Sequence, residues 1–155
     1  MKTDGSDGAK SSDVEIRGEG ALIRLSIFGY ERPDATEYWD ANWLRSKVLV
    51  SISGFRADFP CACHSPELER FRDSLQAMSE ALSRSADYSP MEPSLVLRAV
   101  IDTNGAIDWE CTAEHPLGIG ATLRFRFRSD QSYLRELIAQ LSAALREFPV
   151  RGEPT

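Results

Sequence analysis

The chain of 155 residues contains no apolar run close to the roughly 20 residues that a membrane-spanning helix needs. Residues 1–13 combine Gly, Ser, Asp and Lys without the apolar stretch of a signal peptide, and we expect a disordered tail there. Cysteine is scarce, and three is an odd number that does not suit a paired disulfide framework. These absences predict a protein without membrane contact in a reducing cytoplasm.

Groups suited to catalysis are also few. The chain has two histidines, His64 and His115, and no Gly-x-Ser-x-Gly nucleophile elbow. Residues 118–120 (Gly-Ile-Gly) lack the third glycine and the lysine of phosphate-binding loops. The sequence therefore predicts no catalytic residue, no cofactor and a protein that is not an enzyme.

One group of residues has side chains that can bind zinc. Cys61 and Cys63 are two residues apart and precede His64, and Cys111 and His115 follow later. However, Cys-x-Cys is not the usual spacing of a zinc knuckle, and an isolated cysteine is most often a small buried apolar residue. We predict no metal site and expect these residues to be structural.

The formal charge of −6 and the pI near 5.0 describe an acidic protein. An acidic surface is repelled by nucleic acid and by anionic membranes, and it attracts basic partners. The composition, 42% hydrophobic and 27% charged, is that of an ordinary globular domain. We place a single α+β domain at residues 14–149, followed by a C-terminal tail over 150–155.

Alternating apolar and polar residues predict six strands, near residues 20–28, 43–53, 55–59, 94–102, 105–112 and 122–128. Residues 104–105 (Asn-Gly) predict a type I′ hairpin turn. Two apolar stripes with helical spacing predict helices, one starting at Ser65 and one after Asp130. The stripes are Leu68, Phe71, Leu75, Met78 and Leu82 in the first helix, and Leu134, Leu137, Ile138, Leu141, Leu145 and Phe148 in the second. The βββα-βββα order predicts a six-stranded, mostly antiparallel sheet with two helices on one face.

The other face of that sheet is expected to be open and polar. Asp108 and Glu110 are predicted to share it with Arg124, Arg126 and Arg128, so that opposite charges pair across neighbouring strands. The alternative is a basic stripe that binds an anionic ligand.

Residues 38–44 (Tyr-Trp-Asp-Ala-Asn-Trp-Leu) concentrate three aromatic side chains at the end of a long connection. Tyrosine and tryptophan combine a large apolar area with one polar group. One interpretation is a structural corner that anchors the connection to the core. The other is a recognition surface, for which the candidate partner-binding residues are Tyr38, Trp39, Asp40, Asp34 and Glu37.

Three segments carry a family resemblance: residues 29–33 (Gly-Tyr-Glu-Arg-Pro), 38–44, and 130–134 (Asp-Gln-Ser-Tyr-Leu). With them the chain resembles the WapI-type immunity proteins and their uncharacterised bacterial relatives from about Ile23 to Leu145. The resemblance implies a non-enzymatic protein that binds and neutralises a cognate toxin, and the acidic charge favours a basic toxin domain. An exposed edge strand would also allow a homodimer. The alternative function is a small-molecule or anion-binding domain that uses the open, arginine-bearing sheet face.

Overall fold

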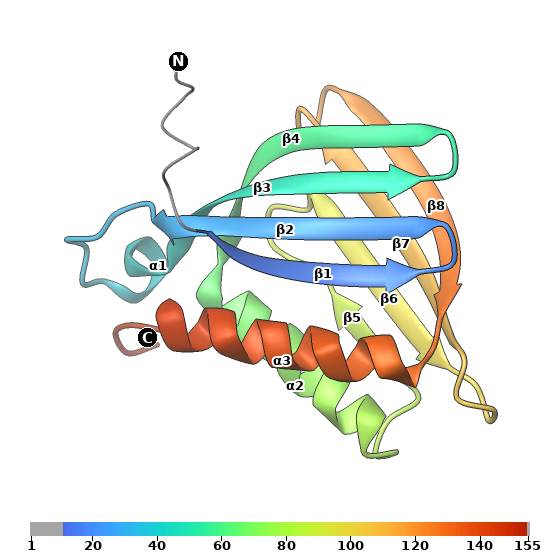
Figure 1. The fold of residues 1–155 in the computed structure, drawn as a ribbon. Helices are drawn as coiled ribbons and strands as arrows, with labels where there is room; N and C mark the ends of the chain where they lie inside the picture. Colours follow the sequence, from blue (N-terminus) through green and yellow to red (C-terminus); the bar gives the residue numbers. More distant parts are fainter. Residues whose placement is uncertain (1–10, 155) are drawn as a thin grey trace.

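The computed structural model describes residues 11–154, and it contains two four-stranded antiparallel sheets, each followed by a long helix (Figure 1). The first sheet has the order β1 (Ser12–Gly18), β2 (Ala21–Tyr30), β3 (Trp43–Ile52), β4 (Phe55–His64) and is followed by α2 (Ser65–Ser79). The second has the order β5 (Ser85–Tyr88), β6 (Leu95–Ile101), β7 (Ile107–His115), β8 (Ala121–Ser129) and is followed by α3 (Gln131–Glu147). A short helix, α1 (Tyr38–Ala41), lies in the connection from β2 to β3.

The α+β class is confirmed, but the single six-stranded sheet is wrong, because the sequence prediction missed β1 and β5. In β1 only Val14 and Ile16 are buried, and charged residues surround both of them. In β5 the strand is four residues long, too short for its alternation to be recognised. The tail predicted over residues 1–13 overlaps β1 at Ser12 and Asp13, and its residues 1–10 lie outside the described part of the chain.

The inner faces of the two sheets pack on each other, and the helices close one side of this sandwich. Figure 1 shows α3 and α2 next to each other beneath the first sheet, with α3 along β1 and α2 along β5. Buried residues from both sheets and both helices form one continuous core, which includes Ile23, Val48, Trp109, Leu75 and Leu141. Within residues 11–154, none of the helices has the length and hydrophobicity needed to span a bilayer.

Both predicted long helices exist, with corrections at their ends. The first apolar stripe is buried except for Leu82, which lies beyond the end of α2 and is 76% exposed. The sequence favours Ser65 as the N-cap of α2, but His64 occupies the N-cap position and Ser65 is the first helical residue. Asp130 caps α3 as predicted, since its carboxylate accepts a hydrogen bond from the Ser132 amide at 2.9 Å.

The predicted type I′ turn at residues 104–105 is wrong. A type I′ turn needs positive φ at both central residues. Here Gly105 has a φ of 87°, while Asn104 stays outside the left-handed region. The Asp102 carboxylate accepts hydrogen bonds from the amides of Asn104, at 2.8 Å, and Ala106, at 3.0 Å, and so fixes a longer loop in which only Gly105 is left-handed.

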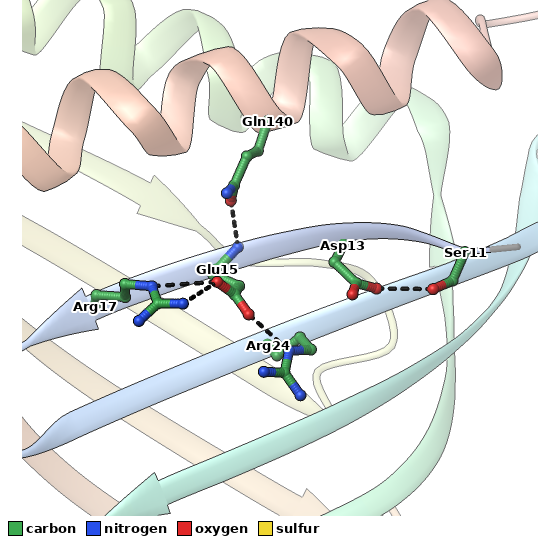
Figure 2. Close-up of polar contacts among 6 residues, drawn as sticks. All are labelled: Ser11, Asp13, Glu15, Arg17, Arg24 and Gln140. Atoms are coloured by element: carbon green, nitrogen blue, oxygen red, sulfur yellow. Dashed lines mark hydrogen bonds and ion pairs between the residues drawn. The ribbon is translucent and has the colours of Figure 1, made fainter.

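The outer edge of β1 is covered by α3. Figure 2 shows Gln140 of α3 reaching the strand, where its side-chain Oε1 accepts a hydrogen bond from the Glu15 amide at 2.7 Å. The Glu15 carboxylate pairs with Arg17 at 2.6 Å and with Arg24 at 2.7 Å. Burial acts to raise the pKa of the Glu15 carboxyl, but the hydrogen bonds from Arg24 and Arg17 outweigh it and lower the pKa.

Pro60 in the sequence predicts an edge or the end of a strand, and in the structure it lies in the edge strand β4. Proline cannot donate a backbone hydrogen bond, so it weakens this edge as a pairing site for another strand. A homodimer through an edge strand stays a prediction.

Candidate partner-binding loop

The connection between β2 and β3, residues 31–42, forms a loop that projects from the end of the first sheet, at the left of Figure 1. We call it the acidic loop. Glu37 is the N-cap of α1 within it, and its carboxylate accepts hydrogen bonds from the amides of Trp39, at 3.0 Å, and Asp40, at 3.4 Å. The loop is therefore an ordered element with its own helical turn.

Trp39 is both packed and exposed. Its indole stacks on the imidazole of His64, with 4.8 Å between ring centroids and 20° between planes, yet 43% of the residue remains exposed. His64 is buried, and Trp43 packs against it at 4.6 Å. The Nε2 of His64 lies 3.1 Å from the Trp39 carbonyl oxygen; because that oxygen can only accept, Nε2 carries the hydrogen. The buried histidine thus supports a tryptophan at the surface.

The acidic loop has an excess of negative charge. Glu31, Asp34, Glu37 and Asp40 occur at every third position, and all four are exposed. Arg32 is the one basic residue within the loop and pairs with Asp40 at 3.0 Å. Four carboxylates and one guanidinium leave a net charge of −3, half of the formal charge of −6 of the whole chain.

Asn42 joins the end of the loop to the chain that follows α3. Its side-chain Nδ2 donates hydrogen bonds to the carbonyl oxygens of Tyr38, at 2.8 Å, and Arg151, at 2.9 Å. Its Oδ1 accepts a hydrogen bond from the Arg151 amide at 2.8 Å. Asn42 is completely buried, so these bonds are shielded from water. The segment predicted as a polar tail is therefore packed against the acidic loop at Arg151.

All five candidate partner-binding residues lie in the acidic loop. Of the two interpretations of residues 38–44, the structural corner fits the buried residues, and the recognition surface remains open for the exposed ones. Ala41 and Asn42 are fully buried and form a structural corner. Trp39, Asp40, Asp34 and Glu37 are exposed, and Tyr38 is half-buried. Their role in binding stays a prediction.

Sequence reasoning missed two residues of this region. His64 was considered only as a metal ligand or a catalytic base, because nothing in the sequence shows that it packs between two tryptophans. Arg151 lies in a short polar segment with no periodicity, and no local pattern indicates its contacts with the acidic loop.

The cysteines do not form a site with the histidines. Among residues 11–154, no group of three or more His, Cys, Asp or Glu side chains is arranged to hold a metal ion. Burial raises the pKa of the Cys61 and Cys111 thiols to about 12, and it also raises that of Cys63. His115 stacks on Phe59 with 4.9 Å between ring centroids.

The open face of the second sheet carries the predicted pairs of opposite charge. Register places Asp108 opposite Arg128 and Glu110 opposite Arg126, with ion pairs of 3.3 and 4.0 Å. This prediction is confirmed. Arg124 has no carboxylate within ion-pair distance in the described part of the chain.

A broad hollow of about 900 Å³ lies on this face and is open to solvent. It is lined by Val96, Arg98, Thr112, Arg124 and Arg126, among others. Arg98 pairs with an aspartate of β5 at 3.0 Å, so its charge, like that of Arg126, is balanced within the sheet. The hollow is therefore an open, polar surface on which the charge of Arg124 is left unpaired among the described residues, and it is not a closed anion pocket.

Comparison with known proteins identifies the family of the chain. A sequence model of the immunity protein WapI-like family matches residues 15–149. The chain belongs to this family. The match covers nearly all of the described fold, including every element from β2 to α3. No curated protein matches the chain in sequence.

The solved structures that match the chain include two of low sequence identity. Crystal structures of MRP1/MRP2 of Trypanosoma brucei are 12% identical, with a TM-score of 0.46, covering 90% of this chain and 85% of that one. A guide-RNA-binding protein complex bound to a guide RNA is also 12% identical, with a TM-score of 0.48, covering 89% of this chain and 90% of that one.

Proposed function

We propose that this WapI-like protein is a non-enzymatic, cytoplasmic immunity protein that neutralises a cognate toxin by binding a basic toxin domain through the acidic loop. The observation that carries the proposal is the position of Trp39: an exposed indole, fixed from below by His64, stands among four exposed carboxylates. Membership of the immunity family supports binding to a toxin.

The chemistry of the loop fits a basic protein surface. The loop residues carry a net charge of −3, which becomes −2 when the single positive charge of the Arg151 guanidinium beneath them is counted. This negative charge attracts a basic domain over about 8 Å at physiological ionic strength and raises the rate of association. Tryptophans in the centre of an interface commonly contribute about 2 kcal/mol or more to binding, and Trp39 is held in one orientation before the partner arrives. The acidic loop therefore combines electrostatic attraction of the partner with a pre-positioned tryptophan for the interface.

The test requires the cognate toxin domain, to be sought as the C-terminal domain of a toxin encoded next to this gene, and it measures binding by surface plasmon resonance. Trp39→Ala is expected to weaken binding by about 30-fold or more, which corresponds to the ~2 kcal/mol of an interface hot spot. Tyr133→Ala is the matched control, because Tyr133 is an aromatic residue of α3 with nearly the same exposure, 42% against 43%. An equal loss of affinity in Trp39→Ala and Tyr133→Ala would contradict the proposal.

The contribution of charge is tested with Asp34→Asn. Asp34 makes no side-chain hydrogen bond or ion pair within residues 11–154, so this change removes a charge without breaking a contact. Glu69→Gln in α2 is the control, since Glu69 is also exposed and lies in a different element. We expect a slower association rate and a weaker salt dependence for Asp34→Asn alone.

A second candidate function is anion binding in the hollow on the open face of the second sheet. It is favoured by Arg124, whose charge has no partner among the described residues. Titration with inorganic phosphate tests it: heat that disappears in Arg124→Ala would support this function, whereas no heat with the unaltered protein would reject it.

A further inference from the structure

We infer that Arg151 is a positioning residue that holds the acidic loop in its binding conformation. This inference rests on the proposed function, since it concerns the same loop. The chain turns back after α3, and Figure 1 shows it ending beside α1. Arg151 lies in this returning segment and directs its guanidinium beneath the loop.

The guanidinium joins both ends of the loop. Its nitrogens donate to the carbonyl oxygens of Arg32, at 3.1 Å, and Pro33, at 2.9 Å, in the first part of the loop. They also donate to the carbonyl oxygen of Ala41, through Nε at 3.0 Å and through Nη2, in the last part. One side chain therefore fixes the spacing between the two ends.

Two further contacts fix Arg151 itself. Its guanidinium carbon lies 3.7 Å from the centre of the Tyr30 ring, a cation–π arrangement. Its backbone amide and carbonyl bond to the side chain of the buried Asn42. Gly152 follows with a φ of 77°, and a Cβ atom there would come within 3.0 Å of the Thr36 carbonyl oxygen. The backbone therefore runs directly against the loop.

The contacts of Arg151 leave the acidic groups free. All of its acceptors are carbonyl oxygens, and no ion pair within the described residues joins it to a carboxylate. Arg151 thus holds the backbone of the loop without engaging any of its four carboxylates, although Asp40 pairs with Arg32 and Glu37 caps α1. Lysine cannot replace this arrangement, because its ammonium is a point charge and lacks the planar fork that reaches separate acceptors.

Hydrogen exchange of the free full-length chain, followed by mass spectrometry, tests the inference without a partner. Arg151→Ala is expected to speed exchange of the loop amides, such as that of Ala41, by about tenfold or more, because hydrogen bonds to charged groups are lost. Amides in the centre of β2 and β3 should keep their rates. Arg151→Lys should resemble Arg151→Ala, since charge alone does not restore the fork.

Arg146→Ala is the matched control, because Arg146 is an exposed arginine in the last turn of α3 and its removal changes the net charge equally. It should leave the loop amides unchanged. Two results would overturn the inference: unchanged loop exchange in Arg151→Ala, or equal acceleration in the loop and in the sheets. Neither result depends on toxin binding, so a failure here is distinct from a failure of the proposed function, which the Trp39→Ala binding measurement reports.

Discussion

Asn42 offers the sharpest test of how the acidic loop is attached to the rest of the protein. Its side chain makes three hydrogen bonds of 2.8, 2.9 and 2.8 Å, and the residue has no exposed surface. Asn42→Ala would leave two carbonyl oxygens and one amide without partners. Each buried polar group left unpaired destabilises the fold by about 1–3 kcal/mol, and water that enters the gap restores part of this. We therefore expect the free energy of unfolding to fall by about 2–5 kcal/mol.

Asn42→Asp separates shape from hydrogen bonding. The introduced carboxyl keeps the oxygen that accepts from the Arg151 amide, but it replaces the nitrogen that donates to the carbonyl oxygens of Tyr38 and Arg151. Burial next to those oxygens should raise the pKa of the introduced carboxyl in the folded state above its unfolded value. The destabilisation should therefore be complete above the folded-state pKa and decrease as the pH falls through it, since the protonated form can donate again.

Urea unfolding monitored by circular dichroism, at pH 7 and at pH 4.5, measures both effects. Asn104→Ala and Asn104→Asp serve as controls, because Asn104 is exposed in the β6–β7 turn, and they should change stability by less than about 0.5 kcal/mol. The reasoning is refuted if Asn42→Ala is as stable as the unaltered chain. It is also refuted if the difference in the free energy of unfolding between the unaltered chain and Asn42→Asp grows as the pH falls.

Three further predictions concern the core. Gly18→Ala should destabilise the fold by about 2–3 kcal/mol in thermal unfolding, because a Cβ atom there would lie 2.4 Å from the Arg128 carbonyl oxygen; no loss would contradict the close approach of the two sheets. Ser129→Ala should lower the free energy of unfolding by about 1–3 kcal/mol, because the buried indole N–H of Trp109 donates to the Ser129 hydroxyl at 3.0 Å and would lose this acceptor. The exposed Ser132 serves as the comparison, and Ser132→Ala should have a smaller effect. Burial raises the pKa of all three cysteine thiols, so they should react with a thiol reagent at pH 8 only after unfolding, and rapid reaction in the native state would contradict this.

Strong periodic signals allowed most elements to be predicted from sequence. Arginines alternate with apolar residues along β8, and the apolar stripe of α3 repeats over several helical turns. The type of each element and its buried face were therefore predicted correctly. The β1 and β5 strands were missed because they carry two buried hydrophobic residues each and lie beside a polar segment or two prolines. Without these two strands, the chain appeared to form one sheet instead of two.

The five candidate partner-binding residues lie in one loop of the structure and their role in binding stays a prediction, but the residues that support this loop were not predicted. Trp39 and its neighbouring carboxylates are conspicuous in the sequence, because aromatic and acidic residues cluster there. The supports of the loop, His64 and Arg151, are separated from Trp39 by 25 and 112 positions. Contacts at such separations arise from the tertiary arrangement of β4 and of the segment after α3, and no local pattern encodes them.

The most direct test of the account is a hydrogen-exchange footprint of the unaltered chain with and without its cognate toxin domain, once a toxin encoded next to this gene has supplied one. We predict that protection on binding concentrates in residues 31–42, at the exposed face of Trp39. Protection confined to the open face of β6, β7 and β8, with the acidic loop unchanged, would contradict the central claim.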